Sequence, residues 1–234
     1  MNSVIPTDDH HAFIRMAALF EAALALLAIG IGWLVDIKPD LSYPGWRPFA
    51  IGVAATIPMI GFYYVISWLP IPSLQRIQDL LLDTLGRPLS RCQWHELLLL
   101  AAMAGICEEL LFRGVVQPWL AQWGTTIGWV GTNILFGLAH AVTPAYFVVA
   151  SLMGGYLSAT DAVGQSLYAP ILTHTLYDWF AFAQIAKAYR NRPAAPDHSD
   201  DKSRRSAPAN NPPSIAESAT QPPETRPEND PGDG

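Results

Sequence analysis

The stretch LLLLAAMAGICEELLFRG, residues 97–114, decides the fold of this chain. Its first eleven residues are uncharged, and Glu108, Glu109 and Arg113 follow in the same apolar segment. A charged side chain at the centre of a bilayer costs at least about 2.5–3.5 kcal/mol on insertion scales. The stretch therefore predicts a membrane-spanning helix whose ionisable residues are kept for a function.

Helical geometry separates the two glutamates. Glu109 and Arg113 are spaced i, i+4 with the acid first, which is the favourable order for an ion pair. Glu108 points roughly 100° away around the helix. We infer that Arg113 holds Glu109 and leaves Glu108 free to act as a general base. The alternative is a buried ion-pair network that only fixes helix packing.

The composition of the whole chain agrees with a membrane protein. Of 234 residues, 50% are hydrophobic and 15% are charged, and the polar residues gather near the C-terminus. The net charge of −6 provides no basic face, so nucleic acid is excluded as a partner.

Apolar stretches predict an all-α, polytopic membrane helix bundle with about six transmembrane helices. The expected spans are residues 12–35, 49–69, 90–116, 127–141, 145–159 and 168–186. Asp161 and Gly164 fit a turn after the fifth span. Glu21 lies inside the first span, where it is expected to be a neutral carboxyl bonded to a neighbouring helix. A role in a substrate path is the alternative.

One segment between the second and third spans is amphipathic. Residues 73–85 place leucine and isoleucine at helical spacing among charged residues, with Ser73 as a candidate N-cap. Gly86 and Pro88 are expected to end this helix, and Ser90 to cap the next one with Gln93 at its third position. We expect the segment to lie on the membrane surface, with a soluble packing helix as the alternative.

Three regions follow from these patterns. Residues 1–89 form an N-terminal transmembrane pair with the amphipathic helix, and residues 90–189 form a helical core that carries the two adjacent glutamates. Residues 190–234 are too polar to bury a core, which predicts a disordered cytoplasmic tail. Lys and Arg near the span ends predict a multi-pass protein of the cell (inner) membrane with both termini in the cytoplasm.

Further polar residues lie in separate predicted spans. His140 ends the fourth span, and His174 and Asp178 are spaced i, i+4 in the sixth. In hydrocarbon such groups find their cheapest partners in one another, which predicts a shared wetted cavity with the glutamates.

Two chemistries suit this cavity. In one, Glu108 and His140 hold a water molecule that attacks a peptide carbonyl, while His174 and Asp178 stabilise the oxyanion or orient the water. In the other, His140, His174 and Glu108 bind zinc, which activates the water. The spacing typical of common zinc proteases is absent, so a metal is possible but not required.

At these residues the chain resembles the CPBP family of intramembrane proteases, the CAAX-protease and bacteriocin-processing group. Its EExxxR motif is matched by Glu108, Glu109 and Arg113, its FxxxH motif by Phe136 and His140, and its HxxxN/D motif by His174 and Asp178. The resemblance covers roughly residues 90–186.

The resemblance implies an all-helical membrane fold that cleaves a peptide bond near a membrane-anchored or lipid-modified end. It also implies that Glu108 is catalytic and that His140 shares its water. Asp178 stands where many members carry Asn. An ionised Asp is a poor oxyanion donor, so its alternative role is to orient His174.

The sequence thus predicts an intramembrane endopeptidase of glutamic or metallo type. Its expected partners are a peptide or protein substrate and the lipid bilayer. Two alternatives stay open. One is a non-catalytic scaffold or bacteriocin-immunity protein of the same family, and the other is a transporter that uses the acids as a proton relay.

Overall fold

The computed structural model describes residues 10–42 and 45–192, and every regular element in these two ranges is helical. This confirms the all-α class. The predicted tail lies outside the described residues from residue 193 onward. The elements are α1 (His10–Leu34), α2 (Arg47–Trp68), α3 (Pro72–Arg91), α4 (Trp94–Leu111), the π-helical turn η1 (Phe112–Val116), α5 (Gln117–Ala121), α6 (Thr125–Ala139), α7 (Pro144–Gly164) and α8 (Tyr168–Arg190).

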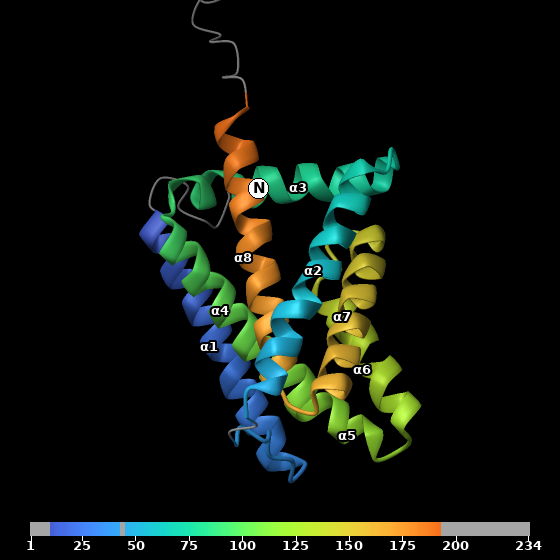
Figure 1. The fold of residues 1–234 in the computed structure, drawn as a ribbon. Helices are drawn as coiled ribbons and strands as arrows, with labels where there is room; N and C mark the ends of the chain where they lie inside the picture. The colour runs from blue at the N-terminus through green and yellow to red at the C-terminus, as the bar shows by residue number, and fades with distance from the viewer. Residues whose placement is uncertain (1–9, 43–44, 193–234) are drawn as a thin grey trace, which may run out of the picture. The chain divides into compact units, whose positions relative to one another are not determined.

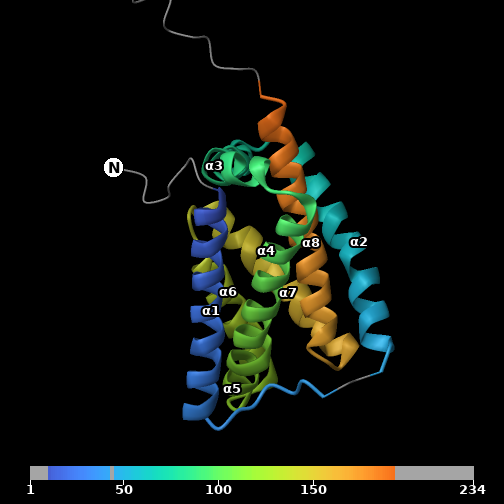
Figure 2. The same ribbon diagram turned by 90° about the vertical axis from the view of Figure 1, so that its left-hand side faces the viewer.

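Helix α8 is the centre of the packing. It contacts α2, α3, α4 and α7, while α1 packs on α4 and α6 packs on α7. Helix α3 runs across the ends of the other long helices, lengthwise in Figure 1 and seen along its axis in Figure 2. This arrangement brings the ends of α4 and α6 to the middle of α8, where the candidate site lies.

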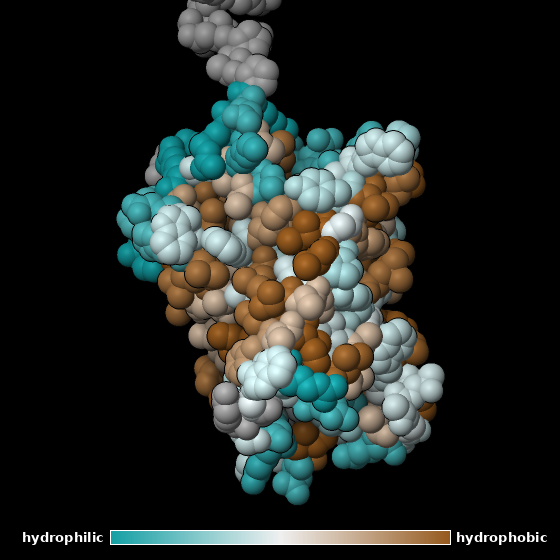
Figure 3. Space-filling view, viewed as in Figure 1, coloured by the Kyte–Doolittle hydropathy of each residue, from teal (hydrophilic) through white to brown (hydrophobic). Residues whose placement is uncertain are grey.

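The exposed surface is that of a protein in lipid. Helices α1, α2 and α7 are long and apolar enough to cross a membrane. Large apolar side chains on α1 and α2 are exposed, including Phe20 and Ile57. Figure 3 shows hydrophobic residues across the middle of this face and hydrophilic residues gathered toward its two ends. The described helices therefore include three candidate spans, and the expected total of about six stays a prediction.

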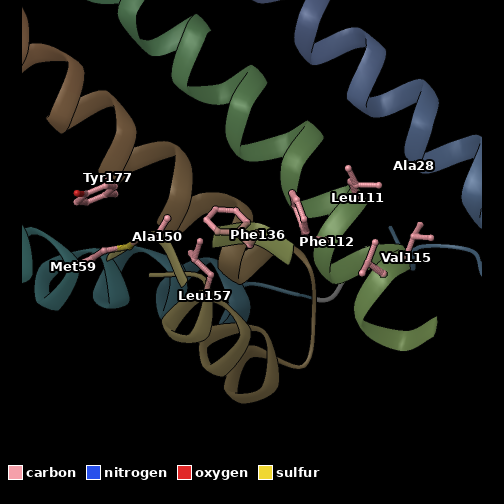
Figure 4. Close-up of a cluster of buried hydrophobic side chains, with 10 residues drawn as sticks. Ala28, Met59, Leu111, Phe112, Val115, Phe136, Ala150, Leu157 and Tyr177 are labelled. Carbon is pink, nitrogen blue, oxygen red and sulfur yellow. The ribbon is translucent and has the colours of Figure 1, made fainter. Parts of the chain in front are cut away.

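A cluster of buried apolar side chains supports the site from one side. It joins residues of α1, α2, α4, η1, α6, α7 and α8. At its centre the rings of Phe112 and Phe136 meet edge to face, with 5.1 Å between their centroids (Figure 4). Phe136 is the aromatic residue of the FxxxH motif, so this packing fixes the turn of α6 that precedes His140.

Glycine lets α4 approach α8 closely. A methyl group added at Gly105 would collide with Thr175, coming within 2.9 Å of its backbone nitrogen. Membrane helices use small residues in this way to bring backbones together.

We therefore expect Gly105→Ala to lower the free energy of unfolding by about 1–3 kcal/mol, because the collision forces α4 and α8 apart. Thermal unfolding in detergent measures the change. Gly61→Ala is the matched control, because nothing lies within 4 Å of its added methyl group. Equal midpoints for the two variants would contradict this packing role.

Helix α3 is longer than predicted. Gly86 and Pro88 do not end it, and it continues to Arg91. Gly86 is buried against Tyr189 of α8, where a methyl group would come within 2.5 Å of the ring. The glycine therefore serves helix packing. The expected Ser73 cap is also wrong, since Ile71 precedes the first helical residue, Pro72.

The start of α4 is another correction. Because α3 extends through Ser90, Gln93 becomes the N-cap, and Glu96 completes a capping box by accepting a 2.7 Å hydrogen bond from the Gln93 backbone nitrogen. The helical chain then continues through η1 to the expected end at Val116 and runs past it in α5. Helix α7 also extends beyond its expected end, so that Asp161 is helical and Gly164 is the last residue.

Candidate active site

The adjacent glutamates occupy the last turn of α4 and are both buried. Arg113 Nη1 donates a 2.8 Å hydrogen bond to Glu109 Oε1, and neither side chain is exposed. The ion pair expected from the i, i+4 spacing is therefore confirmed. Glu108 turns elsewhere, and its Oε2 atom is buried without a hydrogen-bond partner.

Arg113 is held by more than its glutamate. Its Nη2 donates a 2.6 Å hydrogen bond to the carbonyl of Gly154, and its guanidinium carbon lies 4.8 Å from the centroid of the Phe136 ring. Longer contacts of 3.4 Å reach Asn133 Oδ1 and Ser158 Oγ. The guanidinium thus ties α6 and α7 to the end of α4.

Sequence reasoning missed Asn133 and Ser158. Both are buried in apolar helices. Ser158 Oγ lies 2.7 Å from Gln117 Oε1 and 3.1 Å from Asn133 Oδ1, and these two acceptors share its single hydroxyl hydrogen. A polar residue inside a predicted span is the signal that could have found them.

His174 lies between carboxylates. Its Nδ1 donates a 2.8 Å hydrogen bond to Glu109 Oε1, the same oxygen that Arg113 binds. Its Nε2 lies 3.4 Å from Asp178 Oδ2 and 4.0 Å from Glu108 Oε2. Only a doubly protonated imidazole can donate on both sides. Asp178 thus lies beside the ring of His174, and its orienting role stays a prediction.

His140 follows the last residue of α6. Its Nδ1 lies 2.9 Å from the carbonyl of Phe136, and because a carbonyl only accepts, this nitrogen carries a proton. The ring also stacks on Phe136, with 4.6 Å between centroids. Its Nε2 is left 3.7 Å from Glu108 Oε2, a gap that one water molecule can bridge.

These groups share a cavity of about 420 Å³. Glu108, His140, His174 and Asp178 line it, together with apolar residues from α2, α3, α7 and α8, whereas Glu109 and Arg113 are not among its lining residues. All six predicted site residues are thus brought into one cluster. Glu108 faces the cavity, and Glu109 and Arg113 form its support.

The donor set can be tested for a metal. Both histidines hold Nδ1 against an acceptor, which is the usual outer-shell arrangement around metal ligands. Nε2 of His140 lies nearest Glu108, whereas Nε2 of His174 lies closer to Asp178 than to Glu108. Within the described residues, three ligand atoms that all lie within 4.8 Å of one another occur at His10, His11 and Glu96 instead. The site residues have the chemistry for zinc but are spread more widely, and zinc stays a hypothesis.

Fold and site together define a class: an all-helical chain with three candidate membrane spans and a cavity lined by glutamate and histidine side chains. Residues 91–180 match the family model described as type II CAAX prenyl endopeptidase Rce1-like. The matched residues include all three motifs, and the match confirms the resemblance to the CAAX-protease group over this segment. The family is one of proteases. No curated protein and no solved structure gives a significant match.

Proposed function

We propose that this protein is an intramembrane endopeptidase that hydrolyses a peptide bond of a membrane-associated or lipid-modified substrate through a glutamate-activated water. One observation carries the proposal. The unpartnered Glu108 Oε2 lies 3.7 Å from His140 Nε2 at the wall of a cavity. Two acceptors at this separation can hold a water molecule by its two hydrogens and leave its oxygen free to attack.

The residues of this chain can carry out every proton transfer that the reaction needs. The water oxygen attacks the carbonyl carbon while Glu108 takes its proton, and a tetrahedral oxyanion forms. Glu108 next gives that proton to the departing nitrogen, the carbon–nitrogen bond breaks, and the products are a carboxylic acid and an amine. His174 stabilises the oxyanion or orients the water, and Asp178 holds His174 in position.

A bound zinc ion would be held by His140, His174 and Glu108 and would supply a Lewis acid for the same water. The direct glutamate mechanism predicts that activity survives prolonged treatment with a strong chelator. The rate of peptide cleavage before and after treatment checks this. Loss of activity that returns when zinc is added back would favour the metal.

We also propose that the α4–η1–α5 segment, α6 and α8 cross the membrane beside the three candidate spans. With six spans, both termini lie in the cytoplasm of a cell membrane, and residues 1–89 pack on a catalytic core of residues 90–189. Cysteine labelling from either side of sealed vesicles tests this arrangement at loop positions such as Ser42 and Gln122.

The activity itself is tested with purified protein in lipid nanodiscs. The probes are an internally quenched peptide that ends in a farnesylated Cys followed by three residues, the same peptide without the lipid, and an apolar decapeptide. The wild type is expected to cleave at least one of them. Comparison of membrane protein termini in cells with wild type and with Glu108→Gln then identifies natural substrates. If Glu108→Gln and His140→Ala both complement a deletion fully, a non-catalytic scaffold replaces this proposal.

A further inference from the structure

Two polar side chains line the candidate cavity without any role in the chemistry described so far. Glu21 comes from the middle of α1 and Gln78 from α3. Both precede residues 91–180, so neither belongs to the segment that matches the protease family. The N-terminal helices thus contribute polar groups to the cavity that the motif-bearing helices build.

Each of these two side chains has a buried polar atom without a hydrogen-bond partner. Glu21 is only 8% exposed, and its Oε2 atom has no hydrogen-bond partner, so the expected bond to a neighbouring helix is not found there. The Nε2 atom of Gln78 is likewise buried and unpartnered. In the described part of the chain five buried side-chain atoms lack a partner, and three of them belong to residues of this cavity: Glu21, Gln78 and Glu108.

Buried polar atoms in native proteins almost always have partners, so such a concentration indicates a ligand that supplies them. The two groups are complementary: a carboxylate oxygen accepts a hydrogen bond and an amide nitrogen donates one. A peptide main chain offers both an N–H and a C=O at every residue.

The charges around the cavity favour this ligand over a free carboxylate. Its lining carries the acids Glu21, Asp79, Glu108 and Asp178, and no Lys or Arg is found among its lining residues in the described chain. Glu21, Glu108 and Asp178 line the same cavity. An approaching carboxylate would be repelled, whereas a neutral amide N–H would be attracted.

We propose that Glu21 and Gln78 bind the main chain of the peptide substrate, with Glu21 Oε2 accepting an amide N–H and Gln78 Nε2 donating to a peptide carbonyl. This inference rests on the proposed function and deepens it, because it assigns the residues that hold the substrate against Glu108. Their apolar neighbours on α3 and α8, among them Leu81 and Phe182, would receive the substrate's side chains.

Binding to the Glu108→Gln protein tests the proposal without relying on cleavage. The probes are the three peptides above, fluorescently labelled, each made also with a methyl group on one amide nitrogen at a time. With Glu21 intact, methylation at one position is expected to weaken binding about tenfold, because the hydrogen bond to the Glu21 carboxyl group is lost. Combined with Glu21→Leu, the same methylation should have no further effect.

The other residue is tested on the same background. Gln78→Met is expected to raise the dissociation constant about threefold to tenfold. Asp83→Asn is the matched control on α3, because Asp83 is exposed, pairs with Arg192 and does not line the cavity, and it should leave affinity unchanged. Thermal unfolding midpoints exclude a loss of fold.

Two outcomes overturn the inference. One is that none of the peptides binds, and the other is that methylation weakens binding equally with and without Glu21 at every position. Failure of the proposed function looks different. In that case the methylation effect depends on Glu21 in the binding experiment, but the wild type cleaves none of the probes.

Discussion

Glu108→Gln is expected to lower kcat by about 100- to 10,000-fold while leaving the protein folded, since a positioned general base contributes about that much. The amide keeps the size of the side chain but cannot take a proton from water. Glu108 Oε2 has no hydrogen-bond partner among the described residues, so the change breaks no hydrogen bond at that atom. Cleavage of the quenched peptide in nanodiscs gives kcat, and the thermal unfolding midpoint reports folding.

Glu109→Gln is the sharpest comparison, because it changes the adjacent and equally buried carboxylate. Glu109 Oε1 accepts hydrogen bonds from both Arg113 and His174. Loss of its charge should therefore lower stability as well as activity, whereas Glu108→Gln should lower activity alone. Full activity of Glu108→Gln would contradict its role as the base, whatever the second variant does.

Arg113→Met is expected to lower the free energy of unfolding by about 3–5 kcal/mol, because it leaves a buried carboxylate without its strongest partner. The variant also removes the hydrogen bond to Gly154 that ties α7 to the end of α4. Denaturant titration in detergent measures the loss. Arg192→Met is the matched control: its 2.7 Å pair with Asp83 is exposed and should be worth less than about 1 kcal/mol.

A double variant distinguishes the contribution of the ion pair to stability from the contribution of side-chain packing. Glu109→Gln combined with Arg113→Met removes both charges of the pair, so neither residue is left as a buried charge without the other. We expect it to unfold at a higher denaturant concentration than Arg113→Met alone, as coupled neighbours do. If the two losses simply add, the stabilising role of the pair is refuted.

The helical class and the Glu109–Arg113 pair could be predicted because both depend on local spacing along one helix. The meeting of Glu108, His140 and His174 was predicted by a different argument, namely that polar groups in hydrocarbon must find partners. The residues within each motif are close in sequence. Only the structure shows how near the three motifs come to one another in space.

Other features depend on contacts distant in sequence and could not be predicted. Gly86 was expected to end a helix, but its neighbour is Tyr189, about one hundred positions later. The Gln117–Ser158–Asn133 network likewise joins separate helices. Helix α3 also lines the cavity. Its amphipathic pattern predicts a helix with one apolar face but does not specify what that face packs against.

The wide turn η1 has a consequence for how this protein can change. A π-helical turn holds one more residue than an α-helical turn, and such insertions persist mainly where they serve a function. Because a π turn winds less per residue, deleting one residue between 112 and 116 would restore ordinary winding and leave α5 in nearly its present phase. Only the wide turn beside Arg113 would be lost. Homologous chains that keep the extra residue should therefore do so for what the wide turn places next to the two glutamates, since the helices on either side do not require it.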